Sequence, residues 1–141
     1  MERREFLKNT CLVCLAAGGG TSILSLVSCA SLPAVKGDLV NGSVRIPLSA
    51  FGPDNMVIVQ VSSLPYDLAV RRDGSGNCAA YLLKCTHADT QLIPSGDSYH
   101  CSLHGSRFDL DGKVRKGPAS KDLLRYPAVE SDGVIIVTVL S

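Results

Sequence analysis

The segments CTH at residues 85–87 and CSLHGS at residues 101–106 decide how this 141-residue chain is read. Each segment contains one cysteine and one histidine, and residues 88–100 lie between them. Thiolate and imidazole groups are ligands for soft and borderline metals. Gly105, which follows the second histidine, would let the backbone approach a bound group closely. The pattern therefore predicts a metal centre with four ligands: Cys85, His87, Cys101 and His104.

Two kinds of metal centre use two cysteines and two histidines. A [2Fe–2S] core has two irons that each need two protein ligands, and in a Rieske centre two histidines replace two cysteines on one iron. A single Zn²⁺ ion can be held tetrahedrally by the same donors. The order C-x-H followed by C-x-x-H is unusual for zinc fingers, and the flanking sequence is β-rich. The zinc alternative would make the chain a zinc-binding structural lipoprotein.

The two segments and their neighbours resemble the two signature boxes of the Rieske family. The second box, continued by LDGK at residues 110–113, is most similar to the ferredoxin-like branch, and GPA at residues 117–119 resembles the family's proline-containing loop. The resemblance spans residues from about 56 to 139. It implies one [2Fe–2S] cluster per chain, with the cysteines on the inner iron and the histidines on the outer one. It also places Ser106 where its hydroxyl either donates a hydrogen bond to the cluster or caps the turn.

The chain departs from the high-potential branch of that family at three positions. Thr90 and Leu103 stand where quinol-oxidising members have two further cysteines that form a disulfide, and Phe108 stands at a tyrosine position. Hydrogen bonds to the cluster sulfurs raise the reduction potential. We therefore expect a potential between those of the ferredoxin-like and quinol-oxidising groups. Cys78 is the remaining cysteine near the site, and we expect it to be a small buried residue.

From residue 38 onward, short β-branched runs alternate with turn residues, and no amphipathic helix is evident. This spacing favours a sandwich or a small barrel. The predicted fold is all-β, and the resemblance implies a Rieske-like antiparallel β-sandwich with a small cluster-binding subdomain over residues 38–141. The expected strands lie at residues 39–47, 56–61, 68–71, 79–84, 98–101, 106–110, 123–126 and 134–140.

Residues 1–29 are predicted to be an export signal, and residues 30–37 a tether. A basic start precedes the uncharged apolar stretch 11–28, as in secretory signals. The run RREFLK at residues 3–8 resembles a twin-arginine signal, although a plain basic start is the alternative. The sequence LVSC ending at Cys29 resembles a lipobox, which implies a lipidated cysteine and membrane anchoring. An uncleaved anchor is the other reading of this stretch.

The net charge of the chain does not indicate which kind of molecule it binds. The formal net charge is +1, and no basic patch suggests a nucleic acid. We expect a one-electron carrier rather than an enzyme, anchored to a membrane on the exported side of a bacterial cell envelope and serving redox protein partners. The alternative is the iron–sulfur subunit of a membrane oxidoreductase similar to quinol–cytochrome c reductase. An oxygenase is not expected, because it needs a further domain with two more histidines, and only His100 is left over.

Overall fold

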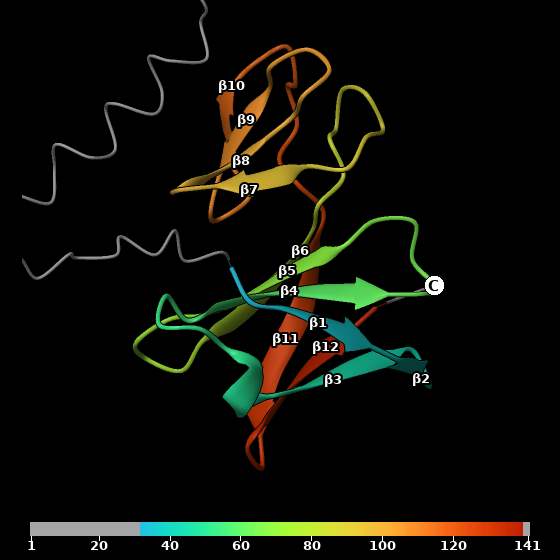
Figure 1. Ribbon diagram of the computed structural model, residues 1–141, viewed down its shortest axis with the longest axis vertical. Helices are drawn as coiled ribbons and strands as arrows, with labels where there is room; N and C mark the ends of the chain where they lie inside the picture. Colours follow the sequence, from blue (N-terminus) through green and yellow to red (C-terminus); the bar gives the residue numbers. More distant parts are fainter. Residues whose placement is uncertain (1–31, 140–141) are drawn as a thin grey trace, which may run out of the picture. The chain divides into compact units, whose positions relative to one another are not determined.

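The computed structural model describes residues 32–139, and this part of the chain is built from strands (Figure 1). The all-β prediction is therefore confirmed. The predicted signal and Cys29 lie outside the described residues. Between residues 32 and 139, no helix is long and apolar enough to cross a membrane. The elements are β1 (Ala34–Gly37), β2 (Leu39–Val40), β3 (Ser43–Pro47), a 3₁₀ turn (Leu48–Ala50), β4 (Met56–Val61), β5 (Leu68–Arg72), β6 (Cys78–Leu82), β7 (Ile93–Ser95), β8 (Ser98–His100), β9 (Arg107–Asp109), β10 (Val114–Lys116), β11 (Arg125–Ser131) and β12 (Val134–Thr138).

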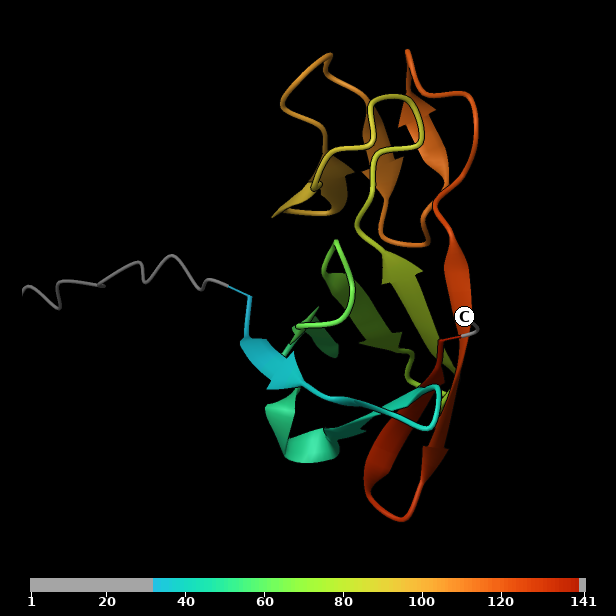
Figure 2. The same cartoon turned by 90° about the vertical axis from the view of Figure 1, so that its right-hand side faces the viewer.

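Eight strands form the larger sheet, in the order β1-β4-β5-β6-β11-β12-β3-β2. Strands β1 and β2 follow each other in the chain but stand at opposite ends of this order. The two edges of the sheet must therefore lie close together, and the sheet curls round on itself (Figure 2). Its inner face holds a core of β-branched and aliphatic side chains, because alternate residues of each strand point to the same face of the sheet. The fully buried members include Val44, Val57, Val59, Leu68, Val70, Ile135 and Val137.

The prediction of a tether over residues 30–37 is wrong for its second half. Ala34–Gly37 form β1, which pairs in parallel with β4 in the register Ala34 to Ile58. The reason is packing at Gly37, where an added Cβ would lie 2.8 Å from the side chains of both Val44 and Val59. The bare backbone of Gly37 can therefore approach the core closely, a contact that the sequence of a short segment does not reveal.

A second, four-stranded sheet is inserted between β6 and β11, in the order β10-β9-β8-β7. It carries its own core, in which Tyr99 and Phe108 are fully buried. Strand β7 was not predicted, because its sequence Ile-Pro-Ser contains a proline that normally argues against a strand interior. This smaller sheet and its loops correspond to the expected cluster-binding subdomain.

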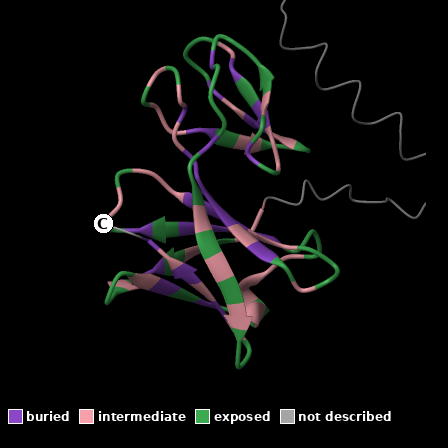
Figure 3. Ribbon diagram, turned by 180° about the vertical axis from the view of Figure 1, so that it is seen from behind, coloured by how far each residue is buried: buried purple, intermediate pink, exposed green. Residues whose placement is uncertain are grey.

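Strand β11 runs further than the predicted 123–126, from Arg125 to Ser131. Exposed and half-buried residues alternate along it, which Figure 3 shows as a green and pink ribbon. One face of β11 packs toward the core and the other faces solvent. The segment between β10 and β11 carries the chain back from the smaller sheet to the larger one.

Candidate metal centre

The first predicted ligand loop leaves the end of β6 and is fixed by backbone hydrogen bonds. The N–H of Cys85 donates to the carbonyl of Thr90 at 2.8 Å, and the carbonyl of Cys85 accepts from the N–H of Asp89 at 3.1 Å. Asp89 has a left-handed backbone with φ of 43°. Its carboxylate pairs with Lys84 at 2.9 Å, and its carbonyl accepts from the hydroxyl of Tyr66 at 2.6 Å. Lys84 at the start of the loop and Tyr66 between β4 and β5 therefore hold Asp89 in place.

The second ligand loop repeats the backbone pattern of the first. The N–H of Cys101 donates to the carbonyl of Ser106 at 2.9 Å, and the carbonyl of Cys101 accepts from the N–H of Gly105 at 3.1 Å. Gly105 has φ of 79°, at the same place in its loop as the left-handed residue of the first loop. Glycine adopts this conformation without steric cost, which explains its presence here. The two loops are structural equivalents that each begin with a cysteine.

The four predicted ligands divide into a buried pair and an exposed pair. Cys85 and Cys101 have no exposed area, whereas His87 and His104 are exposed. The two imidazole rings lie edge to face, with their centroids 5.2 Å apart and their planes at 79°. Within residues 32–139, no three histidine, cysteine, aspartate or glutamate side chains converge on one position for a single ion. Two thiols inside and two imidazoles outside are the donors that a two-iron cluster with two ligands per iron requires.

The environment of Cys101 favours its thiolate. Burial opposes ionisation, but hydrogen bonds from the backbone of Leu103, from the Cys85 side chain and from the backbone of His104 hold the pKa of the Cys101 thiol below its ordinary value. Metal ligation requires the deprotonated sulfur. The backbone of the second loop therefore prepares this cysteine for its predicted role.

The segment between β10 and β11 touches both ligand loops. The N–H of Ala119 donates to Oγ of Ser106 at 3.0 Å, and Oγ1 of Thr86 donates to the carbonyl of Lys121 at 2.7 Å. Ser106 is fully buried, and its hydroxyl proton stays available because the oxygen acts as acceptor in this bond. The hydrogen bond of Thr86 was not predicted from the sequence. The position of this hydroxyl between two predicted ligands could have suggested a structural role, but its partner Lys121 lies far along the chain.

Cys78 is buried, as predicted, and the structure also places Leu103 and Phe108. Cys78 is buried in the core of the larger sheet, where its Sγ lies 3.5 Å from the carbonyl of Gly76. Burial raises the pKa of the Cys78 thiol, which favours its protonated form. Leu103 is 57% exposed beside the predicted ligands, and Phe108 is fully buried beneath them in the smaller core.

The fold and the two equivalent loops define a class: an all-β domain whose small sheet carries two loops, each with a buried cysteine and an exposed histidine, as donors for a predicted metal centre. A family model described as the Rieske [2Fe-2S] domain matches residues 48–127, more than half of the chain. The chain therefore belongs to the Rieske [2Fe–2S] domain family, which binds a [2Fe–2S] cluster.

Two relatives and one solved structure illustrate this membership. The cytochrome b6-f complex iron-sulfur subunit 2 of Trichormus variabilis is 31% identical over 97 residues, which cover 60% of this chain and 54% of the relative. The mitochondrial Rieske subunit of the cytochrome b-c1 complex of Mus musculus is 43% identical over 58 residues, 38% of this chain and 21% of the relative. The chain thus spans about half or less of these relatives. The ferredoxin of carbazole 1,9a-dioxygenase from Nocardioides aromaticivorans superimposes with a TM-score of 0.52 and 25% identity, over 70% of this chain and 98% of that one.

Proposed function

We propose that this protein is a one-electron carrier whose cluster is held by Cys85 and Cys101 on the inner iron and by His87 and His104 on the outer iron. When bound, the cluster supplies a site that accepts and releases one electron. The observation that carries the proposal is the division of the donors into two buried thiols and two exposed, adjacent imidazoles. The exposed imidazole rings offer a path for the electron to the protein surface. The two cysteines are fully buried, so their sulfur atoms are shielded from water.

Residues around the ligands hold the loops and shape the contact surface. The hydroxyls of Thr86 and Ser106 tie both loops to the segment that follows β10. Leu103, 57% exposed next to His104, adds an apolar side chain at the rim. A redox partner would dock over this rim, because apolar contact beside a polar exit suits a transient interface.

The proposal includes membrane anchoring on the exported side of a bacterial envelope. Its support is the sequence alone: the run RREFLK at residues 3–8 and the lipobox-like LVSC ending at Cys29. Residues 30–33 separate Cys29 from β1, and an extended chain of that length reaches about 15 Å. A lipidated Cys29 would therefore hold the domain close to the membrane surface.

A second candidate is the iron–sulfur subunit of a membrane oxidoreductase. The names of the relatives favour it, since they are subunits of cytochrome b6-f and cytochrome b-c1 complexes. Thr90 and Leu103, in place of a pair of cysteines, favour the carrier. Purification from native membranes separates the two, because a subunit would co-purify with a cytochrome b and a carrier would not.

A redox titration of the holoprotein tests the carrier function. We expect one reversible transition with a one-electron slope, at a midpoint inside the range of roughly −150 to +300 mV but well below its top. The reason is that no disulfide joins the loops and that Phe108 lacks a hydroxyl. A midpoint near the upper limit, or the absence of a reversible transition in this range, would contradict the proposal.

Replacing Phe108 with tyrosine is expected to raise the midpoint potential by tens of millivolts. The added hydroxyl at this buried position would donate a hydrogen bond toward the cluster, which stabilises the reduced form. Tyr99→Phe is the matched control, because its hydroxyl lies instead near the carbonyl of Leu110 at 3.4 Å and the sulfur of Met56 at 3.6 Å. The same potentiometric titration measures both. An unchanged potential in a folded F108Y protein would show that this position does not tune the cluster.

A further inference from the structure

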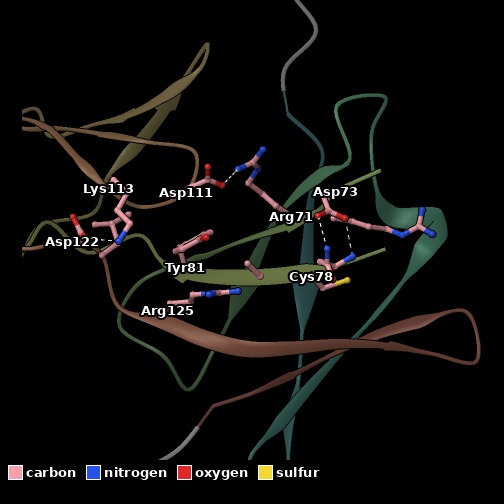
Figure 4. Close-up of a pocket in the computed structure, with 12 residues that line it drawn as sticks. Arg71, Asp73, Cys78, Tyr81, Asp111, Lys113, Asp122 and Arg125 are labelled. Atoms are coloured by element: carbon pink, nitrogen blue, oxygen red, sulfur yellow. Dashed lines mark hydrogen bonds and ion pairs between the residues drawn. The ribbon is translucent and has the colours of Figure 1, made fainter. Parts of the chain in front are cut away.

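A hollow of about 390 Å³ is lined by residues of β5, β6 and β11 in the larger sheet, by residues of the turn between β9 and β10, and by residues of the segment before β11 (Figure 4). Its floor follows from the strand register: Arg71 on β5 pairs with Ala79 on β6, and Tyr81 on β6 pairs with Arg125 on β11. These four side chains share one face, and the small Ala79 leaves space between the larger ones. The hollow is lined by Arg71, Arg72, Asp73, Asn77, Cys78, Ala79, Tyr81, Asp111, Lys113, Asp122, Leu123 and Arg125.

Hydrogen bonds and ion pairs within the protein already engage the carboxylates of this hollow. Asp111 pairs with Arg71 at 2.5 Å, and Asp122 pairs with Lys113 at 2.8 Å. Asp73 accepts from the backbone N–H groups of its own turn and from the side-chain amide of Asn77. These partners lower the pKa values of Asp73 and Asp122. All three carboxylates therefore stay ionised: Arg71 and Lys113 offset the charges of Asp111 and Asp122, whereas Asp73 accepts only from neutral N–H groups and keeps its charge.

Two donors in the hollow have no acceptor among residues 32–139. Arg125 is exposed and forms no ion pair in this part of the chain, whereas Arg72 is held by Glu130 at 2.6 Å. The hydroxyl of Tyr81 has no hydrogen-bond partner in the described residues, yet no side-chain polar atom there is both buried and unpaired. The hydroxyl therefore opens to solvent in the hollow. Figure 4 shows Arg125 lying alongside Tyr81.

The pKa of Tyr81 also indicates that Arg125 lies close to its hydroxyl. Burial raises the pKa of Tyr81, and Arg125 is the cation that most opposes the rise. A guanidinium with a neighbouring hydroxyl offers several N–H donors and one O–H donor to the same ligand. An oxyanion would satisfy both groups, since charge-assisted hydrogen bonds from arginine are among the stronger ones in proteins.

We propose that this hollow is an oxyanion-binding site in which Arg125 and Tyr81 hold either a phosphate or the carboxylate of a small organic acid. None of the four predicted metal ligands lines the hollow, and the proposal does not depend on the proposed electron-transfer function. The acids already paired on its walls keep Arg71 and Lys113 in place and leave Arg125 for the ligand.

The test is a titration of the ¹⁵N-labelled holoprotein with sodium phosphate and, separately, sodium succinate, at constant ionic strength. We expect saturable shifts of the backbone N–H signals of Tyr81 and Arg125 with at least one anion, and the anion that saturates identifies the source. Arg125→Gln should raise the dissociation constant about tenfold, and Tyr81→Phe should weaken binding by a smaller factor. Arg45→Gln is the control, because Arg45 is exposed on β3 outside the hollow.

Two results would overturn the proposal. The first is the absence of a saturable shift with either anion. The second is an equal loss of binding in the Arg125 and Arg45 variants, which would mean diffuse attraction to a surface rather than a site.

Discussion

Replacing Cys101 with serine is expected to abolish the cluster. The thiol is fully buried, its loop backbone favours the thiolate, and a serine hydroxyl at this position is a far poorer ligand for iron. The iron and acid-labile sulfide content of the purified variant should fall from about two of each per chain to near zero. The visible absorption of the cluster should disappear with them.

Cys78→Ser is the matched control for this result. Cys78 is also a buried cysteine, but it lies in the core of the larger sheet next to Gly76. Its replacement should leave the iron content unchanged and only lower the free energy of unfolding slightly. A variant at Cys101 that still holds a full cluster would contradict the ligand assignment. A loss of iron in both variants would point to general unfolding, which circular dichroism would detect.

Replacing Gly112 with alanine is expected to destabilise the domain by about 3 kcal/mol. Gly112 has φ of 73°, and an added Cβ would lie 2.7 Å from the ring of Tyr81 and 3.2 Å from Cβ of Leu123. The carbonyl of Gly112 also accepts from the N–H of Leu123 at 2.8 Å, so the shift would propagate into the segment that ties the ligand loops. Chemical denaturation measures the change.

Gly133→Ala separates the two causes of this destabilisation. Gly133 has nearly the same φ of 76°, but nothing lies within 4 Å of an added Cβ. Its replacement should therefore cost only the backbone term, about 1 kcal/mol. Equal losses in the two variants would show that the clash with Tyr81 is relieved by local movement and that Gly112 is not tightly packed.

Much of the larger sheet could be predicted because its strands are short apolar runs that alternate with turn residues. Met56–Val61 was predicted with the observed bounds, since a β-branched run between turn residues permits few other structures. Strands β1 and β7 could not be found in this way. The first is defined by a parallel pairing with β4, and the second contains Pro94, so both depend on tertiary neighbours.

The metal centre shows a similar division. The spacing of cysteine and histidine in the two loops indicates the donor set, because ligand chemistry restricts residue types strongly. The hydrogen bonds from Thr86 to Lys121 and from Ala119 to Ser106 could not be inferred, since they join segments far apart in the chain. The left-handed backbone of Asp89 was also not predicted. It becomes understandable only once the structure shows that Asp89 occupies the same position in the first loop as Gly105 in the second.

The EPR spectrum of the dithionite-reduced protein tests the central claim most directly. Two histidines on one iron of a reduced [2Fe–2S] core should give a rhombic signal with a low average g value. Ligation by buried Cys85 and Cys101 and exposed His87 and His104 predicts that signal. A silent spectrum, together with one zinc ion per chain by native mass spectrometry, would contradict it.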